Sequence, residues 1–369
     1  MNINLIFTYG VSLKDWEISG ILDRELEMYR RMILNNGTVV NLITFGDNED
    51  DDILIDDENI NTYPVYKYIK KTRSPFLNFL SSFLIPFKLK EELKNGDLIK
   101  TNQLNGSWIG IILKFILKKP LIIRTGYNVY EFSKNERKSK IKQLFYFYLT
   151  KYSLKFSDKY LVSSNSDLVF LRENFSNTEN VVVFPNWVDS LKYNDFKNRY
   201  PNKVLSVGRL EDQKNYQFLI QKFANSKIEL DIVGEGSRKN ELKKLAKKNN
   251  VNVNFLGRVD YFELQEIYKN YRIFIMPSLF EGNPKALLEA LASGCLVFAL
   301  KNKNIEEIIV NKKNGILFTL ETDLNREIEK YLYSENSFNS LTTGAYDYIK
   351  ENNLINILLE KEMEIYKKL

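Results

Sequence analysis

Histidine is absent from the 369-residue sequence, and cysteine occurs only once, at Cys295. Without histidine the chain lacks the commonest general base, the commonest metal ligand and the usual activator of a catalytic serine or cysteine. Any catalysis must therefore use carboxylates, Arg, Lys, Tyr or main-chain groups. A single cysteine forms no disulfide within the chain, so a reducing, cytoplasmic compartment is expected.

The sequence also lacks a long apolar run and a leader-like start. Its longest apolar stretch begins at Gly106 and is interrupted by Lys114, Lys118 and Pro120, too soon to cross a membrane. The opening MNINLIFTYG has no basic start, no long apolar stretch and no small-residue cleavage site, so it predicts a first buried strand and not a signal peptide.

Size and charge narrow the class of protein further. Apolar residues make up 44% and charged residues 27% of the chain, which is typical of a globular protein. The length suits two domains of roughly 150 to 200 residues each, with a cleft. Lys and Arg outnumber Asp and Glu by 53 to 47, for a net charge of +6. This surplus suits phosphate-bearing ligands or an anionic membrane surface better than nucleic acid.

Strand-like and helix-like segments alternate in both halves of the chain. The pattern predicts parallel sheets covered by helices, that is, two Rossmann-like domains. We expect strands at INLIFTYG, TVVNLITFG, DLIKTNQ, PLIIRT, DKYLVSSN, NVVVFPN, KVLSVG, IELDIVG, VNFLG, RIFIMPS and CLVFAL. We expect helices at about 21–35, 75–93, 107–117, 141–156, 215–224, 237–249, 261–270 and 284–293, and helical structure from about residue 337 onward. The polar stretch 189–202 is the predicted linker.

One segment, FEGNPKALLEALASGCLV from Phe280, contains candidate ligand-binding groups. It follows the predicted strand RIFIMPS, at the end of the sheet where ligands of open α/β proteins bind. Asn283 is a favoured N-cap and Pro284 a favoured first helical residue. The amides of the next residues, Lys285, Ala286 and Leu287, would then face the cleft and suit a phosphate or a sugar oxygen.

Two glutamates in this segment are not explained by helix capping. Glu281 precedes the helix and Glu289 lies too deep in it for a capping box. Ionised carboxylates accept hydrogen bonds from sugar and ribose hydroxyls, although, taken by themselves, two surface acids on a helix face would be the favoured interpretation; the neighbouring residues favour a site. Gly208, Arg209 and Lys214 follow the strand KVLSVG, so two cations and the amides would converge on a diphosphate.

Five segments in order resemble the family 4 retaining glycosyltransferases of the GT-B fold. They are GRLEDQKN, VGEGSRKNEL, FLGRV, MPSLFEGNPKALLEALASGCLV and IEEIIVNKKNGILF. TYGVSLKDWEISGILDRELEMYRRM and IIRTGYN further resemble bacterial members that build surface polysaccharides. The resemblance implies an acceptor-side domain over 1–190, a nucleotide-sugar domain over 200–345, and a terminal helix over 346–369 that packs back on the first domain.

The resemblance also implies the reaction. A hexose-type sugar would move, with retention and without a metal or cofactor, from a nucleoside-diphosphate sugar, UDP- or GDP-linked, to a glycan or polyprenyl-linked acceptor in surface polysaccharide biosynthesis. Arg209 and Lys214 would hold the leaving diphosphate, Glu281 the donor sugar and Glu289 the ribose. The enzyme would be cytoplasmic and peripheral on the inner face of the membrane.

The other donor-binding positions implied by the resemblance are mostly glycines and main-chain groups. They are Gly20, Gly208, Gly234, Gly236, Arg258, Val259, Gly282, Asn283, Pro284, Lys285, Ala286 and Leu287. Gly20 is read equally well as a flexible loop glycine. VGEGSRKN lacks the third glycine of a dinucleotide fingerprint and has Lys239 in its place, which argues against a nicotinamide enzyme.

The acceptor side departs from the family. Where relatives carry a histidine, this chain reads RTGYN, and Arg124, Tyr127 and Asn128 are the candidate acceptor contacts. The family reaction needs no protein base, because the leaving phosphate takes the acceptor's proton.

Two sequence features, and the function as a whole, allow more than one interpretation. The run GDNEDDD at 46–52 contains an Asp-x-Asp pair, as in metal-dependent sugar transferases, but a solvated acidic loop is favoured. The helical stretches from Phe76 and Ile141 mix aromatic residues with lysines, which suits either an anionic membrane or core packing with lysines at the rim. Rival functions are a sugar-nucleotide epimerase, a phosphorylase, and a non-catalytic glycan-binding partner.

Overall fold

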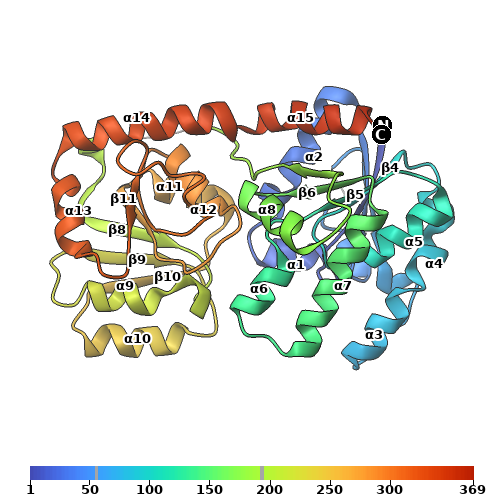
Figure 1. The fold of residues 1–369 in the computed structure, drawn as a ribbon, viewed down its shortest axis with the longest axis horizontal. Helices are drawn as coiled ribbons and strands as arrows, with labels where there is room; N and C mark the ends of the chain where they lie inside the picture. The colour runs from blue at the N-terminus through green and yellow to red at the C-terminus, as the bar shows by residue number, and fades with distance from the viewer. Residues whose placement is uncertain (55–56, 192–194) are drawn as a thin grey trace. The chain divides into compact units, whose positions relative to one another are not determined.

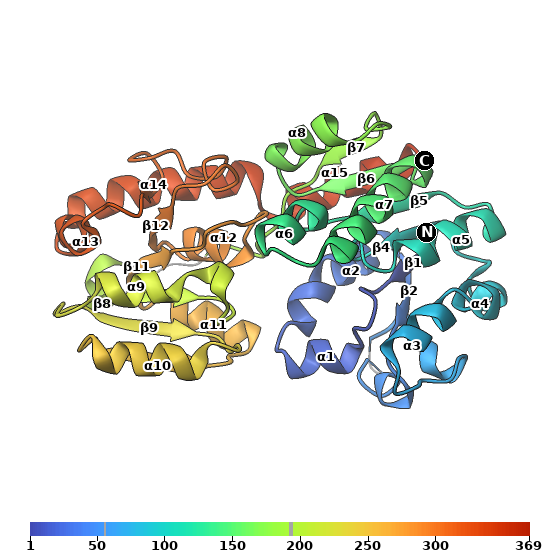
Figure 2. The same ribbon diagram turned by 60° about the horizontal axis from the view of Figure 1, so that its bottom comes forward.

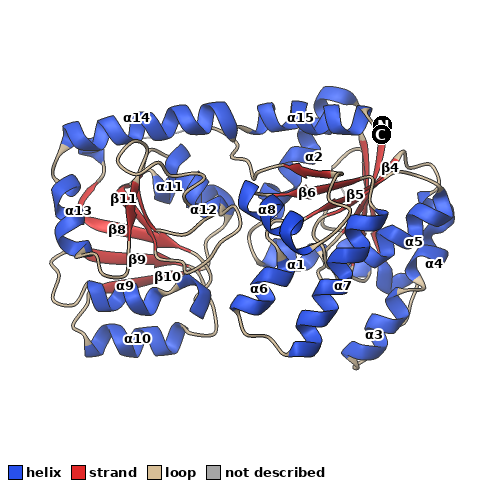
Figure 3. Cartoon of the chain, in the orientation of Figure 1, coloured by secondary structure: helices blue, strands red, loops and turns tan. Residues whose placement is uncertain are grey.

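The computed structural model describes residues 1–54, 57–191 and 195–369. The chain forms two compact units: unit 1 comprises Met1–Pro185 with Leu359–Leu369, and unit 2 comprises Asn186–Leu358. Each unit is built on one parallel β-sheet flanked by helices (Figures 1 and 3), which confirms the expected α/β class with two Rossmann-like sheets. Residues 192–194 of the predicted linker lie outside the described residues. The expected terminal segment 346–369 is divided between the two units.

The sheet of unit 1 has seven strands in the order β3-β2-β1-β4-β5-β6-β7. The strands are β1 Asn2–Ile6, β2 Val39–Thr44, β3 Ile60–Pro64, β4 Leu98–Thr101, β5 Leu121–Arg124, β6 Lys159–Val162 and β7 Val181–Val183. The helices are α1 Leu13–Ile18, α2 Leu22–Asn36, α3 Pro75–Ser82, α4 Ile85–Leu93, α5 Ser107–Leu117, α6 Val129–Asn135, α7 Lys140–Phe156 and α8 Asn165–Asn174, together with the later part of α15 Ile355–Lys367. Figure 2 shows them from a second direction. No helix within the described residues is both long and apolar enough to span a membrane.

The predicted helix 75–93 is in fact two helices, α3 and α4. The break lies between Ser82 and Ile85, and Pro86 stands in the first turn of α4. Proline has no amide hydrogen and collides with the carbonyl four residues earlier, so it ends one helix and begins another.

Most residues of the acidic run, Asp47, Asn48, Glu49 and Asp52, are exposed, as expected of a solvated loop, but Asp50 is buried. Asp50 is 1% exposed and accepts hydrogen bonds from the amides of Leu13 and Lys14, each at 3.1 Å, and from the Thr44 hydroxyl at 2.5 Å. A Cβ on Gly46 would lie 2.0 Å from the Asp50 carboxylate, so the glycine makes room for it. Asp50 therefore satisfies helix-start amides of α1.

A buried ion pair holds the last segment of the chain within unit 1. Lys100, on β4, bonds Glu362, on α15, and both side chains are 2% exposed. The Tyr366 hydroxyl donates to Glu362 Oε1 at 2.6 Å, and Lys100 Nζ lies 5.0 Å from the centroid of the Tyr29 ring. Burial alone would raise the pKa of Glu362, but Lys100, together with the Tyr366 hydroxyl and the charge of Arg124, outweighs burial and the pKa is lowered.

The sheet of unit 2 has six strands in the order β10-β9-β8-β11-β12-β13. The strands are β8 Tyr200–Val207, β9 Glu229–Val233, β10 Val253–Gly257, β11 Tyr271–Met276, β12 Leu296–Leu300 and β13 Ile316–Phe318. The helices are α9 Tyr216–Lys222, α10 Lys239–Lys248, α11 Tyr261–Tyr268, α12 Lys285–Ala292, α13 Leu324–Leu332 and α14 Glu335–Asn352, followed by the start of α15. Buried side chains form one core cluster with α9, α10 and α13 and another with α11, α12 and α14.

Candidate functional site

The strand order of unit 2 reverses between β8 and β11. From β8 the chain proceeds outward to β9 and β10, then returns to β11 and proceeds the other way to β12 and β13. In open parallel sheets, the carboxyl ends of the two strands at such a reversal flank a crevice that binds ligands. The loops that follow β8 and β11 carry Arg209, Lys214 and Glu281, so the fold brings these predicted residues to one edge of the sheet.

Lys214 and Glu281 are in direct contact. Lys214 Nζ lies 2.5 Å from Glu281 Oε1, with 15% and 8% of the two side chains exposed. The two loops are also joined by main-chain groups, because the Leu279 amide donates to the Gln213 carbonyl at 2.9 Å and Gln213 Nε2 donates to the Phe280 carbonyl at 2.7 Å. The pair thus offers one cation for a phosphate and one carboxylate for hydroxyl groups.

The Tyr216 phenol lies close to the Lys214–Glu281 pair. A Cβ on Gly208 would come within 3.0 Å of the Tyr216 hydroxyl and 3.2 Å of Lys214 Cε, which shows how closely the loop passes over both side chains. Burial, and to a smaller extent the charge of Glu281, raises the pKa of Tyr216 well above its ordinary value. The phenol therefore stays protonated and neutral beside the ion pair.

Helix α12 begins one residue later than predicted, and Asn283 does not cap it. Pro284 is the flanking residue, and no side chain provides a capping bond. The Asn283 side-chain oxygen accepts instead from the Asn186 amide at 2.8 Å, because a segment distant in sequence competes for it. The Leu287 amide donates to the Pro284 carbonyl at 3.1 Å and so is used within the helix.

Both glutamates are buried, which rules out the reading of two surface acids. Glu281 is 7% and Glu289 3% exposed. The Tyr268 hydroxyl, at the end of α11, donates to Glu289 Oε2 at 3.2 Å, and Tyr268 itself is fully buried. A buried carboxylate held by a hydroxyl donor is suited to hold a further hydroxyl.

The glycine loops after β8, β9 and β10 are joined in series. The Gly208 amide donates to the Val233 carbonyl at 3.0 Å, and the Gly234 amide to the Gly257 carbonyl at 2.7 Å. A Cβ on Gly234, where φ is +142°, would lie 2.0 Å from the Gly208 carbonyl oxygen, and one on Gly236 would lie 2.4 Å from that of Leu210. The glycines are required by this close approach of main chains.

The cations at the ends of β8 and β10 differ from Lys214 in exposure. Arg209 and Arg258 are both exposed to solvent, and Val259 is partly buried. The predicted nucleobase segment Gly257–Val259 thus lies next to Gly234, and its own Arg258 side chain is exposed.

Of the other predicted residues, Gly282 is buried and Lys285 and Ala286 are partly buried at the start of α12, in unit 2, and the rest belong to unit 1. Gly20 ends α1 with φ of +67°, and its amide donates to the Glu17 carbonyl at 2.9 Å. Asn128 caps α6, and the Tyr127 ring lies 4.5 Å from that of Phe132. The Arg124 guanidinium lies 5.8 Å from the centroid of the Phe184 ring. Asn128 therefore has a structural role whether or not it contacts an acceptor.

Three residues around the site escaped the sequence analysis: Asn186, Tyr268 and Asn353. Asn353 Nδ2 donates to the Asn186 carbonyl at 2.7 Å, and Asn186 contacts Asn283. Their positions have no local signal, since each acts on a segment far away along the chain. Only the asparagine of PNWVD, in a turn after a strand, could have been suspected.

Residues 191–348 match the family model of glycosyl transferases group 1. The match covers most of unit 2, which is therefore similar to the group 1 glycosyltransferases. An uncharacterized glycosyltransferase of Methanocaldococcus jannaschii is 26% identical over 331 residues, 83% of this chain and 82% of the relative. A Campylobacter jejuni α-1,4-N-acetyl-D-galactosaminyltransferase that acts on an undecaprenol diphosphate glycan is 26% identical over 251 residues, 65% of this chain and 66% of the relative. An Escherichia coli UDP-Gal:α-D-GlcNAc-diphosphoundecaprenol α-1,3-galactosyltransferase is 26% identical over 267 residues, 65% of this chain and 67% of the relative.

Solved structures share the whole fold. HepE of Anabaena, in complex with UDP and glucose, superimposes with a TM-score of 0.78 at 16% identity, over 100% of both chains. Sucrose-phosphate synthase of Thermosynechococcus elongatus gives a TM-score of 0.78 at 18% identity, over 100% of this chain and 98% of that one. The fold is that of the GT-B glycosyltransferases, as the motifs implied.

Proposed function

We propose that the protein is a retaining glycosyltransferase that moves a hexose-type sugar from a nucleoside-diphosphate sugar, UDP- or GDP-linked, to a glycan or polyprenyl-linked glycan. The observation that carries this proposal is the Lys214–Glu281 pair at the strand reversal, beside the start of α12 that no side chain caps. Two relatives named for undecaprenol-linked acceptors and the HepE complex with UDP and glucose support it. Surface polysaccharide assembly in a bacterium is the process that such an acceptor suits.

The ion pair would exchange partners when the donor binds. Lys214 would turn from Glu281 to the diphosphate, and Glu281 would accept hydrogen bonds from the sugar hydroxyls that replace it. Glu289, held by Tyr268, would accept from the ribose diol. Both carboxylates would therefore keep partners throughout.

The same groups would stabilise the transition state. As the bond from the anomeric carbon to the diphosphate oxygen breaks, negative charge grows on the leaving group, where Lys214, Arg209 and the α12 amides would meet it. The acceptor hydroxyl would attack from the same face and pass its proton to the leaving phosphate, so that retention needs no protein base. With two cations in place, the reaction is proposed to need neither metal nor cofactor.

Donor binding and transfer give the decisive test. In EDTA, UDP or GDP should stabilise the wild-type protein in thermal unfolding, because a ligand at a hundred times its Kd adds about 2.7 kcal/mol. Lys214→Met should abolish this stabilisation, whereas Glu281→Gln should retain diphosphate binding and lose sugar transfer. Lys203→Met is the matched control, since Lys203 pairs with Glu229 at the opposite end of β8.

Several outcomes would contradict the proposal. If the protein binds neither UDP nor GDP at millimolar concentration, or if Lys214→Met binds the diphosphate as well as wild type does, the proposed phosphate site is wrong. A product formed without an acceptor would indicate an epimerase, and a requirement for inorganic phosphate would indicate a phosphorylase. Donor binding without hydrolysis or transfer would indicate a glycan-binding partner. NMR of the anomeric proton in the product tests retention.

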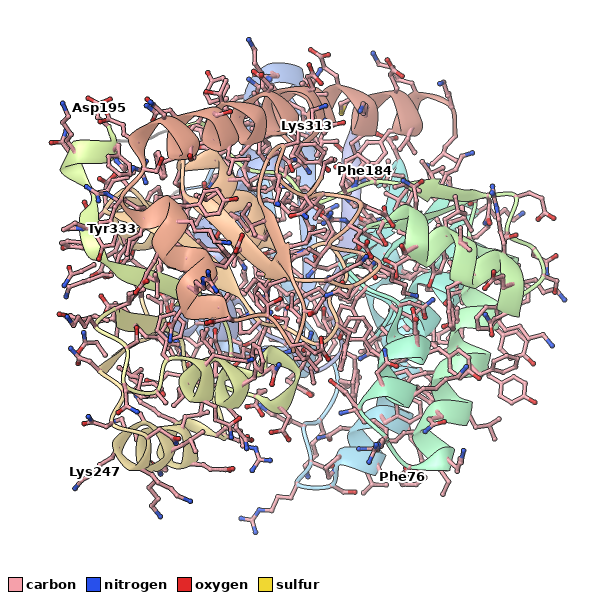
Figure 4. All side chains as sticks on the ribbon, turned by 60° about the vertical axis from the view of Figure 1, so that its left-hand side comes forward. Phe76, Phe184, Asp195, Lys247, Lys313 and Tyr333 are labelled. Atoms are coloured by element: carbon pink, nitrogen blue, oxygen red, sulfur yellow. The ribbon has the colours of Figure 1, made fainter. Side chains whose placement is uncertain are left out.

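Unit 1 has a surface suited to the membrane that would hold a lipid-linked acceptor. We call it the basic apolar face. Its exposed apolar side chains lie on α3, α4, the turn between them, and α7: Phe76, Leu77, Leu80, Phe83, Leu84, Phe87, Ile141, Leu144, Phe145, Tyr148 and Tyr152. Figure 4 shows Phe76 at the periphery of the molecule, and this residue is 67% exposed. Core packing therefore does not account for these side chains.

An aromatic contact joins the two parts of the face, and the segments that carry it are rich in basic residues, of which Lys67 and Lys138 pair with Asp51 and Glu136. The rings of Phe79 and Phe145, on α3 and α7, lie 5.9 Å apart and join its two parts. Residues 67–90 and 137–157 contain twelve Lys and Arg and no Asp or Glu, although the whole chain carries a net charge of only +6. The excess of basic residues is thus concentrated beside exposed apolar side chains, the combination that binds anionic lipid surfaces.

We therefore propose peripheral association with an anionic membrane, on its cytoplasmic side. Sedimentation with phosphatidylglycerol vesicles should capture the protein, and pure phosphatidylcholine vesicles or high salt should not. Phe76→Ser with Leu144→Ser should weaken binding at least several-fold, whereas Phe262→Ser, which changes a 65% exposed residue of unit 2, should not. Equal binding to both kinds of vesicle, or no effect of the double change, would contradict this surface.

A further inference from the structure

Asn186 donates two hydrogen bonds to Asn283, which lies just before α12. Its main-chain amide donates to Asn283 Oδ1 at 2.8 Å, and its side-chain Nδ2 donates to the Asn283 carbonyl oxygen. Both asparagines are 8% exposed. Asn186 therefore holds both the side chain and the main chain of Asn283.

These bonds act directly before the helix start. Pro284 is the flanking residue of α12, and its side chain cannot accept a hydrogen bond from the first amides of the helix, so no side chain caps α12. Asn283 directly precedes Pro284, and its side-chain oxygen is bonded to the Asn186 amide. The start of α12 therefore has amides without a side-chain cap and the positive dipole that suit an anion.

A second asparagine fixes the first. Asn353, 1% exposed at the end of α14, donates through Nδ2 to the Asn186 carbonyl at 2.7 Å. The Val188 amide donates to the Asn353 carbonyl at 2.9 Å, and the Ile355 amide to the Val188 carbonyl at 3.0 Å. The chain passes between units just before Asn186 and again shortly after Ile355. Within unit 2, its first residues and its last helical segment are thus bonded to each other and, through Asn186, to the segment before α12.

We propose that Asn186 is a positioning residue for the diphosphate, with Asn353 acting through it. This inference rests on the proposed function. Asn186 touches no substrate: it keeps the Asn283–Pro284 main chain in the conformation that presents the first turn of α12 to the phosphates. Loss of its side chain releases the Asn283 carbonyl, and the anion-binding end of the helix loses its orientation.

The test compares a ligand that has the phosphates with one that lacks them. Isothermal titration should give a Kd for the preferred diphosphate, UDP or GDP, that rises about ten-fold in Asn186→Ala, about 1.4 kcal/mol. The Kd of the corresponding nucleoside, measured by NMR titration, should not change. Asn353→Ala should move the diphosphate Kd in the same direction by a smaller factor. Asn325→Ala is the matched control, because it removes a similar bond, Nδ2 to the Lys222 carbonyl at 2.7 Å, elsewhere in unit 2.

The outcomes separate this inference from the proposed function. If wild type binds a diphosphate and both Asn186→Ala and Asn353→Ala bind it equally well, the positioning role is overturned and the function stands. An equal loss of diphosphate and nucleoside affinity would show a general structural defect, and would also overturn it. If wild type binds neither UDP nor GDP, both fall. Should Asn186→Ala fail to fold, Asn353→Ala still decides, since it removes only the supporting bond.

Discussion

The Lys100–Glu362 pair is the most exacting test of how unit 1 is held together. Lys100→Met removes the cation but leaves the Glu362 carboxylate buried, with the Tyr366 hydroxyl bonded to it. Breaking a buried pair by removing one partner typically costs about 3–5 kcal/mol, because the remaining charge has lost its compensation. We expect a loss in that range in the free energy of unfolding of unit 1.

A double variant should recover much of the loss. In Lys100→Met with Glu362→Leu no charge remains buried, and replacement of an ion pair by apolar groups is often nearly neutral. The Tyr366 hydroxyl then lacks its acceptor, which costs about 1–3 kcal/mol. The double variant should therefore be more stable than Lys100→Met and no more stable than wild type.

The pH dependence of the two proteins should have opposite signs. In wild type, Lys100 lowers the pKa of Glu362 below its ordinary value of 4.5, so the stabilisation is present above that value and is lost as the pH falls through the lowered pKa. In Lys100→Met burial, the largest single influence on Glu362, is opposed only by the Tyr366 hydroxyl and the charge of Arg124, so we expect the pKa of Glu362 to rise above 4.5. The variant is then penalised above pH 4.5 and recovers as the pH falls toward it. The difference between the two proteins should shrink from about pH 8 to about pH 5.

Urea unfolding measures these quantities if the signal comes from unit 1 alone. The chain has three tryptophans, and in a Trp187→Phe background the remaining two, Trp16 and Trp108, lie in unit 1. Lys94→Met is the control, because Lys94 pairs with Glu91 at the surface and should have no measurable effect. A loss below about 1 kcal/mol in Lys100→Met, or a difference independent of pH, would refute the reasoning.

Three further predictions concern single side chains. Tyr268→Phe should weaken UDP or GDP binding several-fold and reduce the preference for ribose over 2′,3′-dideoxyribose nucleotides, because Glu289 loses a donor; an unchanged preference in titration calorimetry would contradict this. Asp50→Ala should lower the stability of unit 1 by about 1–3 kcal/mol, because buried donors lose their acceptor, and an unchanged melting temperature would count against it. Gly234→Ala should abolish diphosphate binding and lower the melting temperature, since its Cβ would meet the Gly208 carbonyl; retained affinity would show that the loop can move aside.

Much of the fold was predictable because its signals are local. Short apolar runs separated by amphipathic segments predicted the strands of both sheets, and VNFLG matches β10 residue for residue. Helix 107–117 likewise matches α5. β3 and β13 were missed, since Ile60–Pro64 and Ile316–Phe318 are short and carry weak patterns. The break between α3 and α4 could have been inferred from Pro86 alone.

The candidate site was predictable only in part. The motifs placed Lys214 and Glu281 after neighbouring strands, and the parallel sheet then brings them within hydrogen-bonding distance. Burial decided what the motifs could not: Glu281 and Glu289 are not surface acids. Helices α4 and α7 each bury some apolar side chains, such as Leu89 and Leu149, and expose others, such as Phe87 and Leu144, and composition does not show which side chains face outward.

By itself, the sequence determined the α/β class, most of the strands and the longer helices, and the residue types available for chemistry, because each depends on local periodicity or on composition. Tertiary structure alone decided which groups meet. Local preference makes Asn283 an N-cap, yet α12 begins one residue later, with Pro284 as its flanking residue, and the Asn283 side-chain oxygen accepts from the amide of Asn186, 97 residues away in sequence. A local preference worth about 1 kcal/mol is readily overridden by two hydrogen bonds formed only in the folded chain.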